Sequence, residues 1–421
     1  MSRLFRNSSI QVFVSLLLFF VLPSCGFVGD LLPFGLGVGE HASPEYGEGA
    51  SKSNPDQVRK TSSAWVEALV EELAGSSSVA GVGLVTDTPF QMVVPFCVGE
   101  RLASGVRCDL LLGVGDSREI FVFSPHTLRG KSLGLFEEPF SHLSSRAEGG
   151  ELVATYRNTV TVFSLPSLQK VKVLERVPAD IQAVDTTVLD DVALLGGGDG
   201  RVYRWSWNEA IHPSEGKLGR SDLERYFAHN TVVSAVRYHP TGRVFFSGDW
   251  DGVIFAWKGY EQDPYGGAFD ENIFGTGFFS DATTTVRIGG TAPAQVEKLL
   301  LSEKGLYLVA GYASGEIDLW KVRGLKKTVR VQHHRGSVVG LAVSPEATRV
   351  ASYGRDQRLV VSDVLGTLNA TLGVTEYEGK KVMEERIPGV RDLFFVEEDK
   401  LLLIREDGVA FKEIELEQEE E

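Results

Sequence analysis

The spacing of hydrophobic residues changes once along this chain, near Ser78. Before this point, Ser62–Gly75 places its apolar residues at helical intervals, with a serine at its start and a glycine at its end. Serine is a preferred helix cap and glycine a preferred terminator, so the pattern predicts one short helix over residues 61–76, with an apolar stripe that docks on the main body. After Ser78 the spacing becomes that of β-strands.

This second part of the chain repeats one pattern of strands and turns. An apolar strand is followed by a turn and a second apolar strand, and a turn of the D-G type then leads to a third strand that ends in an aromatic residue. The clearest copy extends from His229 to Trp257, and a weaker copy begins at His334. Self-similarity of this kind is typical of repeat architectures.

The copy at residues 229–257 resembles a WD repeat, the unit of one class of β-propellers. In that family a loop histidine, a serine or threonine on the second strand, an aspartate in the tight turn and a tryptophan on the third strand form a hydrogen-bonded set. The resemblance places this set at His229, Ser247, Asp251 and Trp257. Buried imidazole and carboxylate groups need partners, so we expect the set to be structural rather than catalytic.

The weaker copy keeps only part of this set. His334, Ser352 and Asp356 match, whereas Ser362 replaces the tryptophan. The resemblance implies an all-β fold over residues 78–417, a propeller whose blades each contain four antiparallel strands.

Counting third strands gives seven blades, with six and eight as alternative counts because the first copies are degenerate. The last copy leaves little chain for a fourth strand. We expect Val79–Val85 to supply that strand from the N-terminal side, which closes the ring and removes an exposed sheet edge. The predicted third strands are Ile120–Phe123, Thr159–Phe163, Val202–Trp205, Val253–Trp257, Glu316–Trp320, Leu359–Val361 and Val409–Phe411.

Two segments interrupt the regular repeat length, and such interruptions usually form surface loops. Asn208–Phe227 is mixed in charge, and we expect it to be partly helical around Ser221–Tyr226. Lys258–Pro293 combines glycines with aromatic residues, which favour a protein interface but also suit a small core beneath the loop. The candidate interface residues are Tyr260, Tyr265, Phe269, Phe274, Phe278 and Phe279.

The first residues have the pattern of a bacterial lipoprotein export signal. Arg3 and Arg6 precede the apolar run Ile10–Leu22, which is too short to span a bilayer as a helix. Val21–Cys25 resembles the lipobox, in which the cysteine is acylated, by palmitate among other chains, and becomes the first residue of the mature protein. A plain secretory signal and an uncleaved anchor are the alternatives.

This pattern predicts where the protein is located. A signal peptide at residues 1–24 and a lipid on Cys25 imply a membrane-anchored, extracytoplasmic protein, on the periplasmic side or at the cell surface. Gly26 is compatible with an outer membrane, in a host that has one. Residues 25–60 are rich in Gly, Ser, Pro and acidic residues, which is typical of a flexible tether, and residues 418–421 form an acidic tail.

Composition restricts the class of partner. The formal net charge is −15, and hydrophobic residues make up 43% of the chain, which is enough for a large core. The acidic balance argues against nucleic acid as a partner, because phosphate binding needs clustered Lys and Arg.

Two further cysteines flank a predicted hairpin. If Met92–Val98 and Cys108–Val114 are antiparallel strands in a symmetric register, the sulfur atoms of Cys97 and Cys108 lie opposite each other. We expect a disulfide there, with two buried free thiols as the alternative.

Catalytic signatures are missing from the sequence. It contains no G-x-S-x-G, H-E-x-x-H, P-loop or paired C-x-x-C motif. His333 and His334 are neighbours whose side chains point to opposite faces of a strand, which argues against a shared metal. We therefore expect no catalytic residue, cofactor or metal.

The resemblance implies a rigid platform that binds other proteins. In its anchoring and architecture the chain also resembles propeller lipoproteins that assist outer-membrane protein assembly, which suggests a role in the cell envelope. The alternative is a propeller enzyme, either a quinoprotein-like oxidoreductase or a hydrolase, with its site in the central channel.

Overall fold

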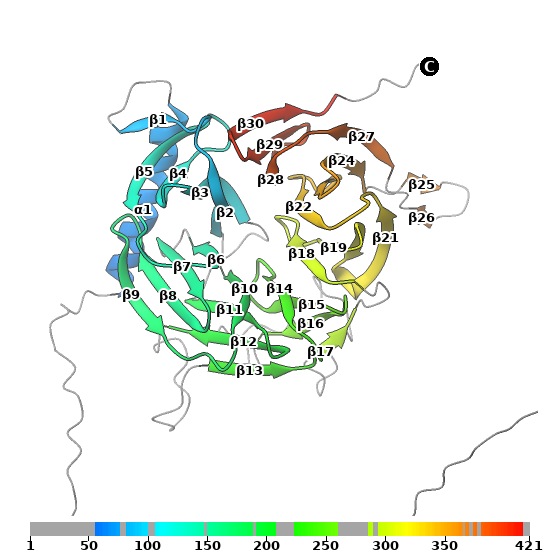
Figure 1. The fold of residues 1–421 in the computed structure, drawn as a ribbon, viewed down its shortest axis with the longest axis horizontal. Coiled ribbons are helices and arrows are strands. Elements are labelled where there is room, and N and C mark those ends of the chain that lie inside the picture. Colours follow the sequence, from blue (N-terminus) through cyan, green and yellow to red (C-terminus); the bar gives the residue numbers. More distant parts are fainter. Residues whose placement is uncertain are drawn as a thin grey trace, which may run out of the picture. The chain divides into compact units, whose positions relative to one another are not determined.

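Seven small antiparallel sheets follow one another around a ring in the computed structural model (Figure 1). This arrangement confirms the predicted seven-bladed propeller. The residues that the structure describes are 55–75, 81–99, 106–146, 150–187, 191–207, 223–259, 285–288, 294–364, 367–369, 374–376 and 380–415.

Apart from the outermost strand of the first blade, the strands of each blade are ordered along the chain from the centre outward. The inner strands are β2 (Phe90–Gly99), β6 (His142–Arg146), β10 (Ile181–Thr186), β14 (Val233–Tyr238), β18 (Val296–Leu301), β22 (Val338–Val343) and β28 (Val390–Glu397). The second strands are β3 (Val106–Gly115), β7 (Glu151–Tyr156), β11 (Val192–Gly197), β15 (Val244–Asp249), β19 (Tyr307–Tyr312), β23 (Arg349–Gly354) and β29 (Lys400–Arg405).

The outer half of each blade confirms all seven predicted third strands to within one or two residues at each end. The third strands are β4 (Glu119–Phe123), β8 (Thr159–Ser164), β12 (Arg201–Ser206), β16 (Ile254–Lys258), β20 (Glu316–Lys321), β24 (Arg358–Asp363) and β30 (Gly408–Glu413). The fourth strands are β5 (Arg129–Leu135), β9 (Gln169–Leu174), β13 (Leu223–Phe227), β17 (Thr285–Arg287), β21 (Lys326–Gln332) and β27 (Lys381–Arg386). A short 3₁₀ turn, η1 (Arg323–Leu325), precedes β21.

The core lies between successive blades, because each blade is covered on both faces by its neighbours. All six residues of β11 and of β15 are buried. Glycine on a second strand allows the next inner strand to approach closely: a Cβ at Gly248 would lie 2.7 Å from Cγ1 of Val296, and one at Gly311 would lie 2.7 Å from Cγ1 of Val338. Real Cβ atoms do not approach so closely, so a larger residue at either position would push two blades apart.

The predicted helix is present but begins earlier than expected. Helix α1 spans Pro55–Ala74, so the last residues assigned to the tether belong to it. Proline fits the first turn of a helix, where its missing N–H breaks no hydrogen bond, so Pro55 marks the start of this helix. Val66, Leu69 and Leu73 are buried against the first two blades, which confirms the predicted docking stripe.

Ring closure differs from the prediction. The segment expected to complete the last blade instead forms β1 (Val82–Leu84), which pairs antiparallel with β5 as a fifth strand of the first blade. The last blade has three strands, β28, β29 and β30. Val85, just after β1, packs against residues of the last blade, and the N–H of Val409 donates to the carbonyl of Thr86 (2.8 Å). Side-chain packing between the first and last blades closes the ring, with Phe90 and Phe123 against Leu402 and Ile404.

Both predicted interruptions contain a blade strand at their end. The helical stretch expected at Ser221–Tyr226 is wrong, because Leu223–Phe227 is strand β13, paired along β12. Glu224 accepts two hydrogen bonds from the buried Arg204 across this pair, at 2.9 Å each. The second interruption is likewise shorter than predicted, because Thr285–Arg287 pairs with β16 as β17.

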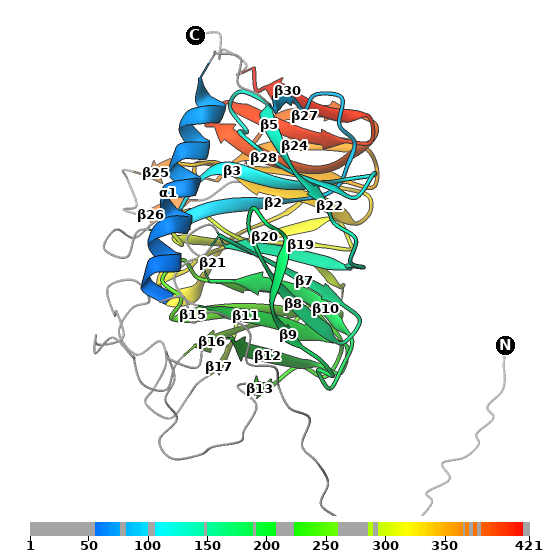
Figure 2. The same cartoon turned by 90° about the vertical axis from the view of Figure 1, so that its left-hand side faces the viewer.

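The alternation of strand direction gives the propeller two distinct faces. One face carries the turns from second to third strands and the links from one blade to the next, and we call it the histidine face. The insertion face carries the other two sets of turns. A hairpin of β25 (Thr367–Asn369) and β26 (Val374–Glu376) arises there between β24 and β27, and α1 lies on the same side (Figure 2).

Some predictions concern residues outside the described ranges. These are the signal peptide, Cys25, the tether up to residue 54, the acidic tail at residues 418–421, and the aromatic residues Tyr260, Tyr265, Phe269, Phe274, Phe278 and Phe279. Within the described ranges, no helix is both long and apolar enough to cross a membrane.

Candidate functional site

The first histidine network lies between the third and fourth blades, on the histidine face. Nδ1 of His229 is 2.8 Å from Oδ2 of Asp249, and its Nε2 is 2.6 Å from Oγ of Ser247. The indole Nε1 of Trp257 donates to the same Oγ at 2.7 Å. All four side chains are buried.

The aspartate of this network is Asp249, not the predicted Asp251. Asp251 is exposed in the turn, whereas Asp249 is 1% exposed at the end of β15. The sixth blade explains why Asp249 takes the place of Asp251. There, Gly354 is at the position equivalent to Asp249. A Cβ at Gly354 would lie 2.6 Å from the His334 ring, so only glycine leaves room for the aspartate two residues later. In the fourth blade Asp249 fills that room with its own carboxylate.

This correction leads to a stability experiment on the fourth blade. Asp249→Ala is expected to lower the free energy of unfolding by about 2 kcal/mol, because it leaves the buried His229 without its acceptor, while Asp251→Ala is expected to cost less than about 0.5 kcal/mol. Oδ1 of Asp249 also accepts the N–H groups of Asp251 (3.0 Å) and Val253 (2.8 Å), which adds to the loss. Denaturant unfolding of the two variants measures the difference.

A third variant tests the steric reason. Asp249→Gly opens the same space that Gly354 leaves in the sixth blade, so we expect the carboxylate of Asp251 to reach His229. This variant should therefore be more stable than Asp249→Ala, despite the entropy cost of glycine. Adding Asp251→Ala to Asp249→Gly should remove that advantage. Equal losses for Asp249→Ala and Asp251→Ala would contradict the assignment.

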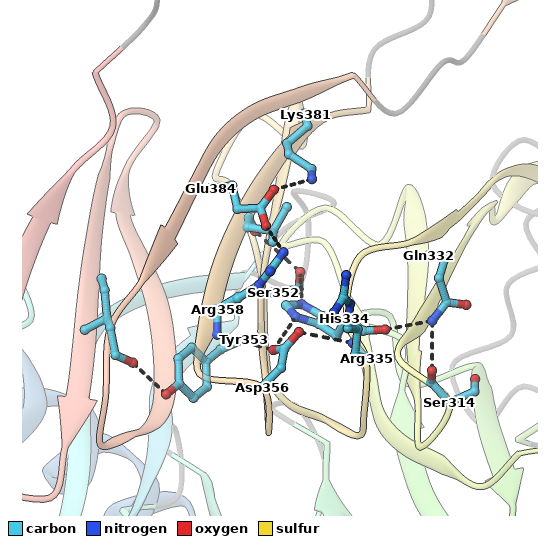
Figure 3. Close-up of polar contacts among 12 residues, drawn as sticks. Ser314, Gln332, His334, Arg335, Ser352, Tyr353, Asp356, Arg358, Lys381 and Glu384 are labelled. Carbon is cyan, nitrogen blue, oxygen red and sulfur yellow. Dashed lines mark hydrogen bonds and ion pairs between the residues drawn. The ribbon is translucent and has the colours of Figure 1, made fainter.

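The second network, in the sixth blade, confirms its three predicted members (Figure 3). Nδ1 of His334 is 3.1 Å from Oδ1 of Asp356, and Nε2 is 2.9 Å from Oγ of Ser352. Burial lowers the pKa of His334, which favours the neutral ring. Burial alone would raise the pKa of Asp356, but hydrogen bonds from the N–H groups of Arg335 and Arg358 and from His334 lower it.

His333 lies near the place of the missing tryptophan in the sixth blade. Its Nε2 is 3.1 Å from Oγ of Ser362, the residue that replaces the tryptophan. The two neighbouring histidines follow the end of β21 rather than lie on a strand as predicted, and their Nε2 atoms contact two different serines. A small, largely apolar pocket between the fifth and sixth blades remains beside His333 and Ser362, lined by valines 309, 329, 331, 350 and 364 together with Ile317 and Leu319.

Both networks have the order of a serine–histidine–aspartate triad, with hydrogen-bond distances that suit a nucleophile and its base. Neither is accessible to a substrate. Ser247 and Ser352 are each 0% exposed, and Ser247 is also occupied by the indole of Trp257. The networks therefore fix turns between blades rather than carry out acyl transfer.

Two buried ion clusters were not predicted. In the first, Arg146 is 1% exposed and donates to Asp191 and to Glu151 (2.7 Å), between the second and third blades. Burial raises the pKa of Glu151, although the charge of Arg146 opposes this effect. In the second, Asp318 is fully buried in the fifth blade, and Arg330 and Lys327 reach it from the outer strand, at 2.5 and 2.8 Å. The sequence signal for these clusters is a charged residue inside an apolar strand, as in E-I-D-L-W.

His239 links two blades on the insertion face. Its Nδ1 is 2.8 Å from Oγ1 of Thr241 in the same turn, and its Nε2 is 3.2 Å from the carbonyl of Gly305 in the next blade. The side chain is 2% exposed, and burial lowers its pKa to about 4.

This shift implies a pH dependence of stability with a definite sign. The pKa is lowered in the folded state, so the unfolded chain binds the extra proton first and stability is lost as the pH falls from about 6.5 towards 4. We expect His239→Gln, which keeps a polar side chain there, to reduce the loss between pH 7 and 4.5 by roughly 2 kcal/mol. Identical pH profiles for the two proteins in urea unfolding would show that His239 does not titrate in this way.

The predicted hairpin of the first blade is present as β2 and β3, but its disulfide stays a prediction. Phe96 is opposite Leu110 and Val98 is opposite Arg107, with an irregularity between them. Cys97 on β2 and Cys108 on β3 both lie within this irregularity, and their side chains are outside the described residues. No group of three or more metal-ligating side chains occurs in the described part of the chain.

Large aromatic side chains are exposed on the histidine face of three successive blades. Tyr156 ends β7, Phe227 ends β13 and Trp250 lies in the turn after β15, with 40, 65 and 49% of their surfaces exposed. Arg157 and Arg201 place their guanidinium groups 5.5 and 5.0 Å from the ring centres of Tyr156 and Phe227. These residues are not predictable from the sequence pattern, because the alternation of apolar and polar residues does not distinguish an exposed strand end from a buried one.

Comparisons with known proteins agree with this geometry. Residues 221–258 match the family model described as WD domain, G-beta repeat. Residues 221–258 therefore form a WD repeat. The matched residues contain β13 of the third blade and β14, β15 and β16 of the fourth, so the sequence repeat is offset by one strand from the structural blade.

The chain matches less than half of the length of each curated relative described below. The chain is 29% identical over 136 residues to the serine-threonine kinase receptor-associated protein of Rattus norvegicus, which covers 32% of this chain and 35% of that protein. It is 24% identical over 215 residues to cell division cycle 20.5, cofactor of APC complex, of Arabidopsis thaliana, which covers 41% and 48%. These names describe association with other proteins, as expected for a protein-interaction propeller. Both relatives are eukaryotic, so bacterial origin stays a prediction.

A solved structure supports the fold alone. The WD40 β-propeller domain of Doa1 superposes with a TM-score of 0.50 at 12% sequence identity, over 79% of this chain and 97% of that one.

Proposed function

We propose that this protein is a lipid-anchored, extracytoplasmic platform that binds other proteins through the histidine face of its propeller. The exposed aromatic row, Tyr156, Phe227 and Trp250, carries this proposal. Aromatic side chains bury a large area on binding and are enriched among the residues that dominate interface energies. Exposure of these rings to water is unfavourable in the isolated protein, and burial against a partner removes this cost.

The turns of this face are held rigidly, which favours binding. Trp250 donates its backbone N–H to the carbonyl of Val232 (3.1 Å), and Asp249 accepts two backbone N–H groups of the same turn. A residue that is fixed before binding loses less conformational entropy when a partner arrives. The buried network of His229 therefore supports the site without touching the partner.

The charges beside the aromatic row favour one kind of partner. Arg157 borders the ring of Tyr156, and Arg201, which also pairs with Asp199 (2.8 Å), borders the ring of Phe227. Guanidinium groups pair well with carboxylates. A partner surface that combines apolar groups with Asp or Glu at its border fits this row. The relatives associated with a receptor or a larger complex support a binding role of this general kind.

Anchoring and cell-envelope function rest on the sequence pattern at Val21–Cys25. We expect Cys25→Ala to abolish incorporation of labelled palmitate and to release the protein from membranes. The proposed role in envelope or outer-membrane protein assembly depends on this anchor.

A crosslinking pull-down from membranes tests the platform. The test variant replaces Tyr156, Phe227 and Trp250 with serine, and a matched control replaces Val171 and Leu306, which are similarly exposed but lie away from this row. We expect the test variant to lose a specific partner and the control to retain it, with unchanged thermal unfolding in both.

A third variant separates the two candidate interfaces. It replaces the aromatic residues of the large interruption, Tyr260, Tyr265, Phe269, Phe274, Phe278 and Phe279, with serine. Loss of the partner only in this variant would move the interface to the large interruption. Absence of any specific partner would contradict the platform and favour the alternative of a channel enzyme.

A further inference from the structure

The last blade has an outer edge that no strand covers among the described residues. The second to sixth blades have four strands and the first has five, but the sheet of the last blade consists only of β28, β29 and β30. In Figure 1, β30 forms the outermost strand of this blade. Uncovered edges readily pair with another chain, and native proteins usually protect them.

The hydrogen bonds of β30 show which backbone groups face outward. The N–H of Val409 bonds to Thr86 on the outer side, whereas the N–H of Ile414 bonds inward to Asp399. Because neighbouring residues of a strand alternate between its two sides, the backbone groups of Phe411 and Glu413 also face outward. No described residue accepts or donates to them.

The first blade shows that this propeller accepts an added strand at such an edge. β1 pairs with the outer side of β5 through Val82, Gly83 and Leu84. This pairing uses the segment that would otherwise have completed the last blade. The single bond from Val409 to Thr86 holds one end of β30 and leaves the part from Phe411 onward open.

We propose that the outer edge of β30 binds an extended, basic segment of a partner protein as the fourth strand of the last blade. Charge selects this occupant. Glu413 and Glu415 are both exposed at the end of β30. In the antiparallel pairing that all blades use, the N-terminal end of the added segment lies beside these carboxylates, so Lys or Arg belongs there.

Charge also disfavours a second copy of this chain at the edge. Each copy has a net charge of −15, and pairing two β30 edges brings two acidic segments into one interface. The added strand is independent of the aromatic row on the histidine face, so either proposal stands if the other fails.

Hydrogen exchange and peptide binding on the full-length protein test this proposal. The probe is a short fluorescent peptide with two lysines followed by alternating valine and threonine, and the control peptide has glutamates in place of the lysines. We expect the amides of Phe411 and Glu413 to exchange rapidly in the free protein and slowly with the basic peptide. We expect the acidic peptide to bind at least tenfold more weakly.

Two variants make the test specific. Both Phe411→Pro and Phe411→Val remove the ring that packs beside the last blade, but only proline also removes the outward N–H, and neither change removes a bond to β29. We therefore expect Phe411→Pro to bind the basic peptide about tenfold more weakly than Phe411→Val. Glu413→Lys with Glu415→Lys should reverse the preference between the peptides. Slow exchange at Phe411 in the free protein, equal binding to Phe411→Pro, no binding of the basic peptide, or self-association through this edge would each overturn the proposal.

Discussion

Replacing Trp257 with alanine is expected to lower the free energy of unfolding by about 3 to 5 kcal/mol. The ring is 2% exposed and contacts two aromatic neighbours, with ring centres 5.8 Å away at Phe245 and 5.5 Å away at Tyr226. The change leaves a cavity between the third and fourth blades. It also removes the indole donor to Ser247.

The same blade supplies a matched control for this experiment. Trp250 is 49% exposed, so Trp250→Ala removes a similar volume without a cavity and is expected to change stability by less than about 0.5 kcal/mol. Denaturant unfolding at neutral pH measures both variants. A small loss for Trp257→Ala would mean that the fourth blade does not depend on this ring.

Replacing Arg146 with methionine is expected to cost about 3 to 5 kcal/mol, because it leaves two carboxylates buried without their cation. Arg146 is 1% exposed, while the side chains of Glu151 and Asp191 are 14 and 9% exposed. Methionine preserves much of the packing of the arginine stem, so the loss reports mainly on charge.

The dependence of this loss on pH identifies its cause. Burial already raises the pKa of Glu151, and removing Arg146 raises it further, so protonation at lower pH relieves the unpaired charge. The stability difference between the variant and the natural protein should therefore shrink between pH 7 and 5. Arg201→Met, at a residue that is 40% exposed and paired with Asp199, is the control and should have little effect. A pH-independent deficit would assign the loss to packing instead.

Much of the fold was predictable because each blade repeats a local pattern. The turn before each third strand contains residues with strong conformational preferences, and the aromatic or apolar residue at the end of the strand marks its buried side. Trp257 and His334 were assigned from this local information. The serine of each network, Ser247 and Ser352, followed from its fixed distance to the turn.

The errors arose where tertiary contacts outweigh the local pattern. Asp251 has the expected spacing, but the space beside the His229 ring is already occupied by Asp249. Residues 221–226 have a mixed charge pattern that fits a helix, yet pairing with β12 makes a strand of Leu223–Phe227. Ring closure was predicted from the need to cover an edge, and the structure covers the edge of β5 instead.

The buried ion clusters were beyond the sequence analysis for a related reason. Arg146 and Asp191 are distant in the chain and meet only because successive blades bring their turns together. The exposed aromatic row was missed in the same way, since Tyr156, Phe227 and Trp250 belong to three different blades. Single-sequence patterns describe one blade at a time, whereas these features belong to the seams and the face of the whole ring.

Photo-crosslinking from the histidine face tests the central claim most directly. Benzoylphenylalanine at Phe227 keeps an aromatic side chain at a position that is 65% exposed, and the same residue at Leu306, which is 51% exposed on the insertion face, is the control. After irradiation of cells that produce the protein, we expect a specific protein adduct from position 227 and none from position 306. No adduct at position 227, or the same adducts at both positions, would contradict a partner-binding histidine face.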